Sequence, residues 1–299
     1  MDAQSQHRAR TIEEFVVRQQ HFVAASRAAY EAAPLRPRTD DVVIAPYGKC
    51  GTTILQQMFH CLRTRGDMDF DDISRVVPWI EMSPILGLDL NADQKAEPRG
   101  FKSHLNYTSL PKGARYVVSL RDPKDAFVSM YRFMEGWMIE PGAIPMEDFF
   151  TAWAKGGGPE GENYWHHLLS WWAVRDRPDV LLFSYSRLIS DRETHVRRLA
   201  QFAKIELDAE LLDLTVERTS RDYMLAHKDH FDDRLMRELS ERGGRLPTGS
   251  DSAKVRAGSS GNHKDEIPPC VADQIDAIWR ERVTPVTGFI DFSELDAAL

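Results

Sequence analysis

The sequence predicts an α/β protein of three layers, with a mostly parallel central sheet flanked by helices on both faces. Three short apolar runs, at residues 41–46, 114–120 and 180–184, are typical of buried strands, and a helical pattern follows each one. Strands that alternate with helices indicate a parallel sheet with crossover helices. The 299 residues suffice for one large domain, and no internal boundary is evident, so we expect a single domain over residues 1–299.

Residues 1–40 are predicted to form an N-terminal helical arm. Apolar side chains recur at helical spacing between Ile12 and Val23, an alanine-rich stretch continues the pattern, and Pro34 ends it. We expect an amphipathic helix that packs on the domain rather than a membrane or partner helix.

Composition restricts the class of protein. The net charge is −8, which disfavours nucleic-acid binding and requires local basic groups for any bound phosphate. No apolar run reaches the length of a membrane span, and the N-terminus lacks the apolar stretch of a secretory signal. Three scattered cysteines predict neither a disulfide framework nor a zinc site. We therefore expect a cytoplasmic protein that needs no metal.

The turn after the first strand, residues 46–53, has the composition of a phosphate-binding loop. Its glycines allow close backbone approach and positive φ, and its threonines stand at a helix N-terminus, where the dipole favours an anion. A structural turn also needs small residues, but it does not need a lysine between two glycines. Gly-Lys-Ser/Thr is absent, so this is not a Walker A loop. The residues concerned are Gly48, Lys49, Gly51, Thr52 and Thr53.

The second and third strands are each followed by a helix. Asp122 is expected at the N-cap of the first of these, with Pro123 at its first position and Asp125 in its first turn. The helix after the strand at 180–184 is predicted over residues 191–203.

Six segments then agree in order and spacing with one known family. P-x-x-K-x-G-T-T at 46–53 is similar to the 5′-phosphosulfate loop of sulfotransferases that use 3′-phosphoadenosine 5′-phosphosulfate (PAPS), and the 3′-phosphate site of that family resembles residues 117–129. Weaker likenesses follow the same order across residues 41–264. They are Phe101–Leu105 (K-T-H-L in the family), Ser184-Tyr185-Ser186, Thr219-Ser220 and the loop 255–264.

The resemblance implies a P-loop NTPase-like fold and transfer of the sulfuryl group of PAPS to a hydroxyl, leaving 3′,5′-ADP (PAP). It implies three catalytic residues. His104 is the general base for the acceptor, Lys102 holds the sulfuryl oxygens, and Lys49 neutralises the leaving phosphate oxygen. The nucleotide is expected to contact Lys49, Cys50, Gly51, Thr52, Thr53, Arg121, Ser129, Tyr185, Thr219, Arg221, Arg256, Ala257 and Gly258.

The sequence departs from the family pattern around the adenine and the 3′-phosphate. Ile54 and Arg221 replace the two aromatic residues that cover adenine in the family, and Ala257 replaces a lysine of the 3′-phosphate loop. Cys50 is expected to be mildly acidic at its helix N-terminus. The Gly/Ser/Asp-rich stretch 243–264 is predicted to be mobile and to cover the nucleotide.

The acceptor is expected to be a small, largely apolar molecule with a hydroxyl group, bound by an aromatic wall. A P-loop kinase that uses ATP, or a nucleotide-binding module without activity, remains as an alternative. The oligomeric state stays open, because the dimer segment of cytosolic family members is not evident. The expected wall comprises Trp79, Tyr107, Trp137 and Tyr223, with Ile80, Met82 and Met224 beside them.

Overall fold

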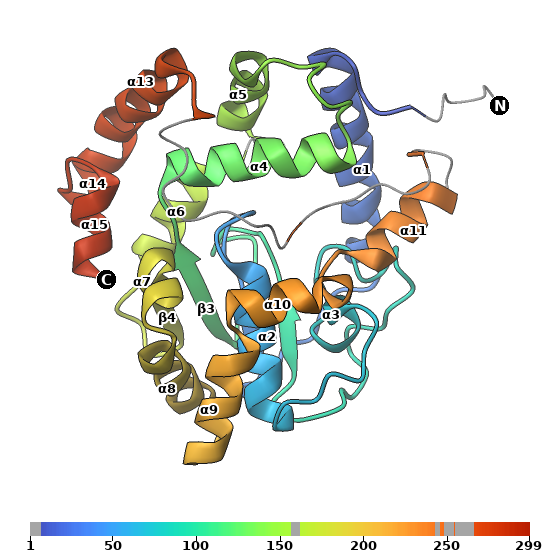
Figure 1. Cartoon of the computed structure of the whole chain (residues 1–299), viewed down its shortest axis with the longest axis vertical. Helices are drawn as coiled ribbons and strands as arrows, with labels where there is room; N and C mark the ends of the chain where they lie inside the picture. Colours follow the sequence, from blue (N-terminus) through green and yellow to red (C-terminus); the bar gives the residue numbers. More distant parts are fainter. Residues whose placement is uncertain (1–6, 157–161, 243–245, 248–253, 255–265) are drawn as a thin grey trace.

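Four short strands form one parallel sheet in the order β2-β1-β3-β4 (Figure 1). The computed structural model describes residues 7–156, 162–242, 246–247, 254 and 266–299. Three strands occupy the predicted apolar runs, whereas β2 falls in a segment that the sequence did not mark as a strand. The parallel sheet confirms the predicted fold class. The strands are β1 (Val42–Ile44), β2 (Gly100–Lys102), β3 (Arg115–Leu120) and β4 (Val180–Ser184).

Alternate strand residues supply two separate buried clusters, one on each face of the sheet. Val42 and Ile44 face a cluster with α2, α8 and α9, whereas Val43 and Ala45 face a cluster with α4, α5 and α6. Because strand side chains point alternately to opposite faces, both faces of this apolar sheet must be covered. The helices of the first part of the chain are α1 (Ile12–Ala32), α2 (Thr52–Thr64), α3 (Ile73–Val76), α4 (Pro123–Trp137), α5 (Met146–Lys155) and α6 (Tyr164–Trp172).

The later helices complete both layers. Helix α8 lies within the predicted range 191–203, and Asp191 caps it through its side chain. Asp122 likewise caps α4, and Pro123 is its first residue. Within the described part of the chain no helix is long and apolar enough to cross a membrane. The later helices are α7 (Tyr185–Ser190), α8 (Arg192–Ala203), α9 (Ala209–Arg218), α10 (Arg221–Ala226), η2 (Lys228–His230), α11 (Arg234–Arg242), α13 (Pro269–Ile278), η3 (Trp279–Val283), α14 (Thr284–Thr287) and α15 (Phe292–Ala298).

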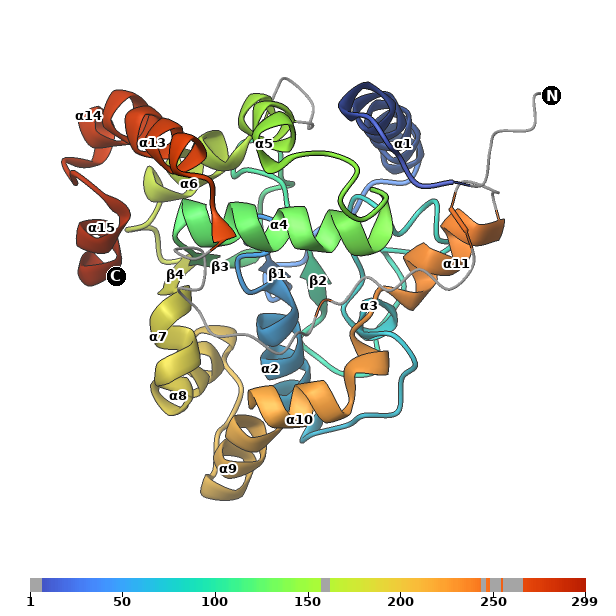
Figure 2. The same cartoon turned by 45° about the horizontal axis from the view of Figure 1, so that its top comes forward.

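The N-terminal arm forms α1 and packs on the rest of the chain. Thr11 caps the helix, and the buried Phe15 belongs to the cluster that also contains Leu295 of α15. Figure 2 shows α1 beside one end of α4, and α4 crossing near the end of the sheet to which the strands point. The site lies at this end, because the carboxyl ends of parallel strands meet there.

Candidate active site

The loop between β1 and α2 opens into a cavity of about 1020 Å³. Lys49 and Gly51 both have positive φ, 67° and 100°, and Gly51 is the N-cap of α2 without a side-chain cap. A Cβ on Gly51 would lie 2.8 Å from Tyr185 Cδ2 and 2.9 Å from Ser119 Oγ. Glycine is therefore required here both by the backbone conformation and by the space.

Strand β3 fixes this loop by bonding to its carbonyl groups. The Ser119 hydroxyl donates to the Cys50 carbonyl, and Arg121 Nη1 donates to the Lys49 carbonyl at 2.8 Å. Gly51, Thr52 and Thr53 line the cavity at the start of α2, where the first N–H groups of a helix have no intrahelical partner. Thr52 Oγ1, which lines the cavity, is buried without a hydrogen-bond partner among the described residues.

Arg121 and Ser129 both line this cavity, as expected for a phosphate site. The Arg121 guanidinium lies 4.6 Å from the centre of the Tyr185 ring, and its Nε has no hydrogen-bond partner among the described residues. Asp125 Oδ2 is 4.0 Å from that Nε, at the limit of an ion pair. The donor capacity that remains on Arg121 suits an anionic oxygen.

Cys50 differs from its expected role. Its side chain is buried and does not line the cavity, with Sγ 3.8 Å from the Gly48 carbonyl. Burial raises the pKa of the Cys50 thiol to about 12, more than the nearby Arg121 charge lowers it. The expectation of a mildly acidic thiol is therefore wrong, because the side chain points into the core rather than along the dipole of α2.

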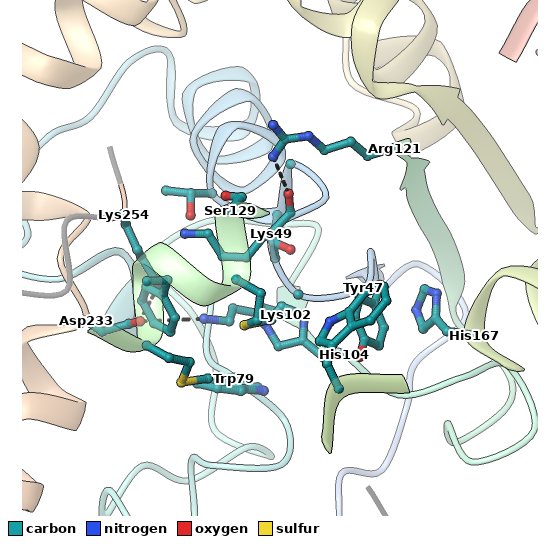
Figure 3. A pocket seen from close by; sticks show the side chains of 18 of the residues that line it. Tyr47, Lys49, Trp79, Lys102, His104, Arg121, Ser129, His167, Asp233 and Lys254 are labelled. Atoms are coloured by element: carbon teal, nitrogen blue, oxygen red, sulfur yellow. Dashed lines mark hydrogen bonds and ion pairs between the residues drawn. The ribbon is translucent and has the colours of Figure 1, made fainter. Parts of the chain in front are cut away.

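Lys102 and His104 lie close together, and both contact the ring of Trp79 (Figure 3). Lys102 Nζ is 3.9 Å from the centre of the indole ring, and the His104 ring meets it edge-on at 5.1 Å. Both residues line the cavity. Strand β2 ends at Lys102, so His104 is placed by the irregular segment that follows.

The surroundings of His104 determine its tautomer. Nδ1 is 2.8 Å from the Pro46 carbonyl, which can only accept, so Nδ1 carries the proton. Burial, assisted by the Lys102 charge, lowers the pKa of His104 to about 3. The ring is therefore neutral at pH 7, with its lone pair on Nε2.

An acidic residue that the sequence reasoning missed faces the lysines of the site. Asp233 Oδ1 is 3.6 Å from Lys102 Nζ and forms an ion pair with Lys254 (Figure 3). Burial raises the pKa of Asp233, but the two ammonium groups outweigh it and lower the pKa to about 2. Burial lowers the pKa of Lys102 to about 8 despite this partner. No family motif covers Asp233 or Lys254, so only the fold reveals them.

The expected adenine end also lies on the cavity. Ile54, Tyr185, Thr219 and Arg221 line it, although the Thr219 hydroxyl donates to the Thr215 carbonyl at 2.6 Å within the core. Arg221 is exposed at the rim, at the start of α10. The expected contacts of Arg256, Ala257 and Gly258, and most of the predicted mobile stretch 243–264, lie outside the described residues.

The opposite half of the cavity is largely apolar, but its wall differs from the predicted one. Trp79, Met82 and Trp137 line it as expected. Tyr107 and Tyr223 do not line it. Tyr107 packs against Trp171 of α6 and Tyr116 of β3, and Tyr223 stacks at 4.1 Å on His227, the residue after its own helix α10. Helix α1 supplies lining that the sequence did not indicate, namely Phe15, Gln19, Phe22, Val23, Ser26, Arg27, Tyr30 and Glu31.

Comparison with known proteins identifies the family of this chain. The model of the sulfotransferase domain matches residues 39–287. Sulfotransferase 1B1 of Canis lupus familiaris is 26% identical over 266 residues, which cover 84% of this chain and 86% of that protein. Luciferin sulfotransferase of Photinus pyralis is also 26% identical, over 85% of this chain and 74% of its own length.

Solved structures show the same fold. Retinol dehydratase in a complex with retinol and PAP superposes with a TM-score of 0.69 at 20% identity, covering 87% of this chain and 85% of that one. A mouse sulfotransferase complexed with PAP gives 0.63 at 19% identity, covering 87% and 91%.

The chain belongs to the sulfotransferase family, because the family model spans most of its length. The predicted membership is confirmed, and with it the prediction of an enzyme, since members of this family are PAPS-dependent transferases.

Proposed function

We propose that this enzyme transfers the sulfuryl group of PAPS to the hydroxyl of a small acceptor with His104 as general base. The observation that carries the proposal is the His104 ring itself. Its Nδ1 proton is committed to the Pro46 carbonyl, so Nε2 is the basic nitrogen, and both the ring and Lys102 line one cavity.

The residues present fit the nucleotide. Loop 48–53 and the start of α2 would hold the 5′-phosphosulfate, and Arg121 with Ser129 would hold the 3′-phosphate. Two buried polar atoms on the cavity, Thr52 Oγ1 and Arg121 Nε, have no hydrogen-bond partner among the described residues. Because buried polar groups are normally satisfied, they support an anionic ligand at this place.

In the proposed reaction, PAPS supplies the sulfuryl group, and the bond that breaks joins its sulfur to the 5′-phosphate oxygen. The acceptor oxygen forms the new bond to sulfur while its proton passes to His104 Nε2. Lys102 stabilises the sulfuryl oxygens, and Lys49 stabilises the charge that develops on the departing phosphate oxygen. PAP and the sulfated acceptor are the products.

A second buried imidazole on the cavity does not compete for this role. His167 Nε2 is 3.0 Å from the Ala45 carbonyl and 3.2 Å from the Trp171 indole nitrogen, so it either donates to the carbonyl or accepts from the indole, according to the tautomer. With Nε2 shared between two neighbours, we assign His167 a structural role. We further propose that residues 1–299 form one domain, supported by the cluster that α1 and α15 share.

Thermal unfolding tests the nucleotide. PAP without Mg²⁺ at 100 times its dissociation constant is expected to stabilise the fold by about 2.7 kcal/mol. Stabilisation by Mg·ATP and none by PAP would favour the kinase alternative, in which phosphoryl transfer replaces sulfuryl transfer.

Substitution of His104 tests the base. His104→Ala is expected to lower turnover by roughly 10²–10⁴-fold while PAP affinity stays nearly unchanged. His167→Ala, which removes a buried imidazole of the same cavity, is the matched control and should lose far less turnover. Normal turnover in His104→Ala would show that this residue is not the base.

A further inference from the structure

Glu81 is an acidic residue on the acceptor side of the cavity that the proposed reaction does not use. It lies two residues after Trp79 and lines the cavity. Its Oε1 accepts a hydrogen bond from the His104 backbone N–H at 2.8 Å. This bond ties the carboxyl group to the same residue that supplies the base, so a molecule that reaches His104 also passes close to Glu81.

The other oxygen of Glu81 has no hydrogen bond of normal geometry in the part of the chain that the structure describes. This oxygen, Oε2, is buried. The pKa of Glu81 is raised, because burial outweighs the lowering by the His104 N–H, the Ser103 hydroxyl and the Trp79 indole. On α1, burial raises the pKa of Tyr30, and the negative charge of Glu81 raises it further.

The other acidic residues on the cavity have cationic partners or, in the case of Glu162, hydrogen bonds of 2.6 Å from Asn106 and Ser109. Glu31 pairs with an arginine at 2.8 Å, Glu266 pairs with another at 2.9 Å, and Asp233 faces two lysines. Glu81 has no ion pair among the described residues. A buried carboxylate without a counterion is costly, so a ligand that brings a positive charge to Oε2 would be favoured.

We propose that the acceptor carries a protonated amine as well as its hydroxyl, and that Glu81 binds the ammonium group while His104 receives the hydroxyl proton. The inference rests on the proposed function, because it assumes that the acceptor lies against His104. At the sulfuryl end of the cavity, Lys49, Lys102 and Lys254 outnumber the carboxylate of Asp233, which directs an ammonium group away from them and toward Glu81. The apolar wall around Trp79 suits the carbon skeleton between the two groups.

Binding to the PAP complex of the full chain tests the inference apart from catalysis. The probes are phenols with para or meta chains of two or three carbons that end either in an amine or in a methyl group of equal length. The best aminoalkylphenol is expected to bind about 10- to 100-fold more tightly than its alkyl partner, as for one charge-assisted hydrogen bond. Its N-acetyl derivative should lose this preference.

Two variants locate the preference. Glu81→Gln should remove it while PAP still binds, which shows that the protein is folded. Glu31→Gln alters a carboxylate on the same cavity that is already paired with Arg27, and it should keep the preference. A preference that survives Glu81→Gln, or its absence from the unmodified protein, would overturn the inference.

Radiolabel transfer from PAPS to the same phenols separates this inference from the proposed function. Selective binding of the amines without sulfation of any probe would contradict the proposed reaction alone. Sulfation of alkyl and aminoalkyl phenols with equal kcat/KM would contradict the ammonium site alone.

Discussion

Replacing Gly51 by alanine tests the phosphate loop most directly. At φ +100° an alanine costs about 1–2 kcal/mol of backbone energy. Its Cβ would also lie 2.8 Å from Tyr185 and 2.9 Å from Ser119, and overpacking of this kind costs about 1–3 kcal/mol. We therefore expect Gly51→Ala to lower the free energy of unfolding by about 2–5 kcal/mol.

Two other glycines separate these contributions. Gly113 has φ +108°, and nothing lies within 4 Å of its added Cβ, so Gly113→Ala should cost only the backbone share of about 1–2 kcal/mol. Gly48 has no positive φ, and its Cβ would meet only the mobile end of Met130, at 2.5 Å. Gly48→Ala is therefore expected to cost less than Gly51→Ala.

Urea denaturation measures the three costs, and calorimetric titration of PAP measures the consequence for the site. Displacing Ser119 and Tyr185 disturbs the groups that hold the loop and face Arg121, so PAP should bind about 10- to 100-fold more weakly to Gly51→Ala. PAP affinity should stay unchanged in Gly113→Ala. Equal destabilisation by Gly51→Ala and Gly113→Ala would refute the steric reasoning.

Three further predictions follow from buried charges. Asp41→Asn breaks the paired bonds of 2.9 and 2.7 Å to the buried Arg99, and urea denaturation should show a loss of about 3–5 kcal/mol; a loss below about 1 kcal/mol would contradict this. His104 has a folded-state pKa of about 3, below its ordinary 6.5, so the unfolded chain binds more protons than the folded one between these pH values. The free energy of unfolding therefore decreases as the pH is lowered. Lowering the pH from 7 to 5 should reduce the free energy of unfolding through His104 by about 2 kcal/mol, and His104→Gln should lack this loss in the same urea measurements. Asp233→Asn removes a negative charge beside Lys102, so calorimetry should find tighter binding of PAP; unchanged affinity would show that the carboxylate does not face the nucleotide.

The sequence could predict the phosphate loop because its signals are local. A buried strand, a glycine-bearing turn and an amphipathic helix follow one another without a break between Val42 and Thr64, and the cap of α4 is equally local. Lys102 and His104 could also be predicted from the sequence, because they lie two residues apart in one motif. Glu81 and Asp233 carried no such signal, since each acts through a partner distant in sequence: the backbone N–H of His104 for Glu81, and Lys102 for Asp233.

The parallel α/β class and the residues of the phosphate loop follow from the amino-acid order alone, because the apolar periodicity and the turn chemistry reside in consecutive residues. The directions in which the side chains of the site point depend instead on how the elements pack. Packing turns Cys50 into the core and Tyr107 and Tyr223 away from the cavity, and it brings α1 onto the acceptor side. Burial and pairing across the fold also set the neutral state of His104, because desolvation depends on every element packed around a group and not on its neighbours in the chain.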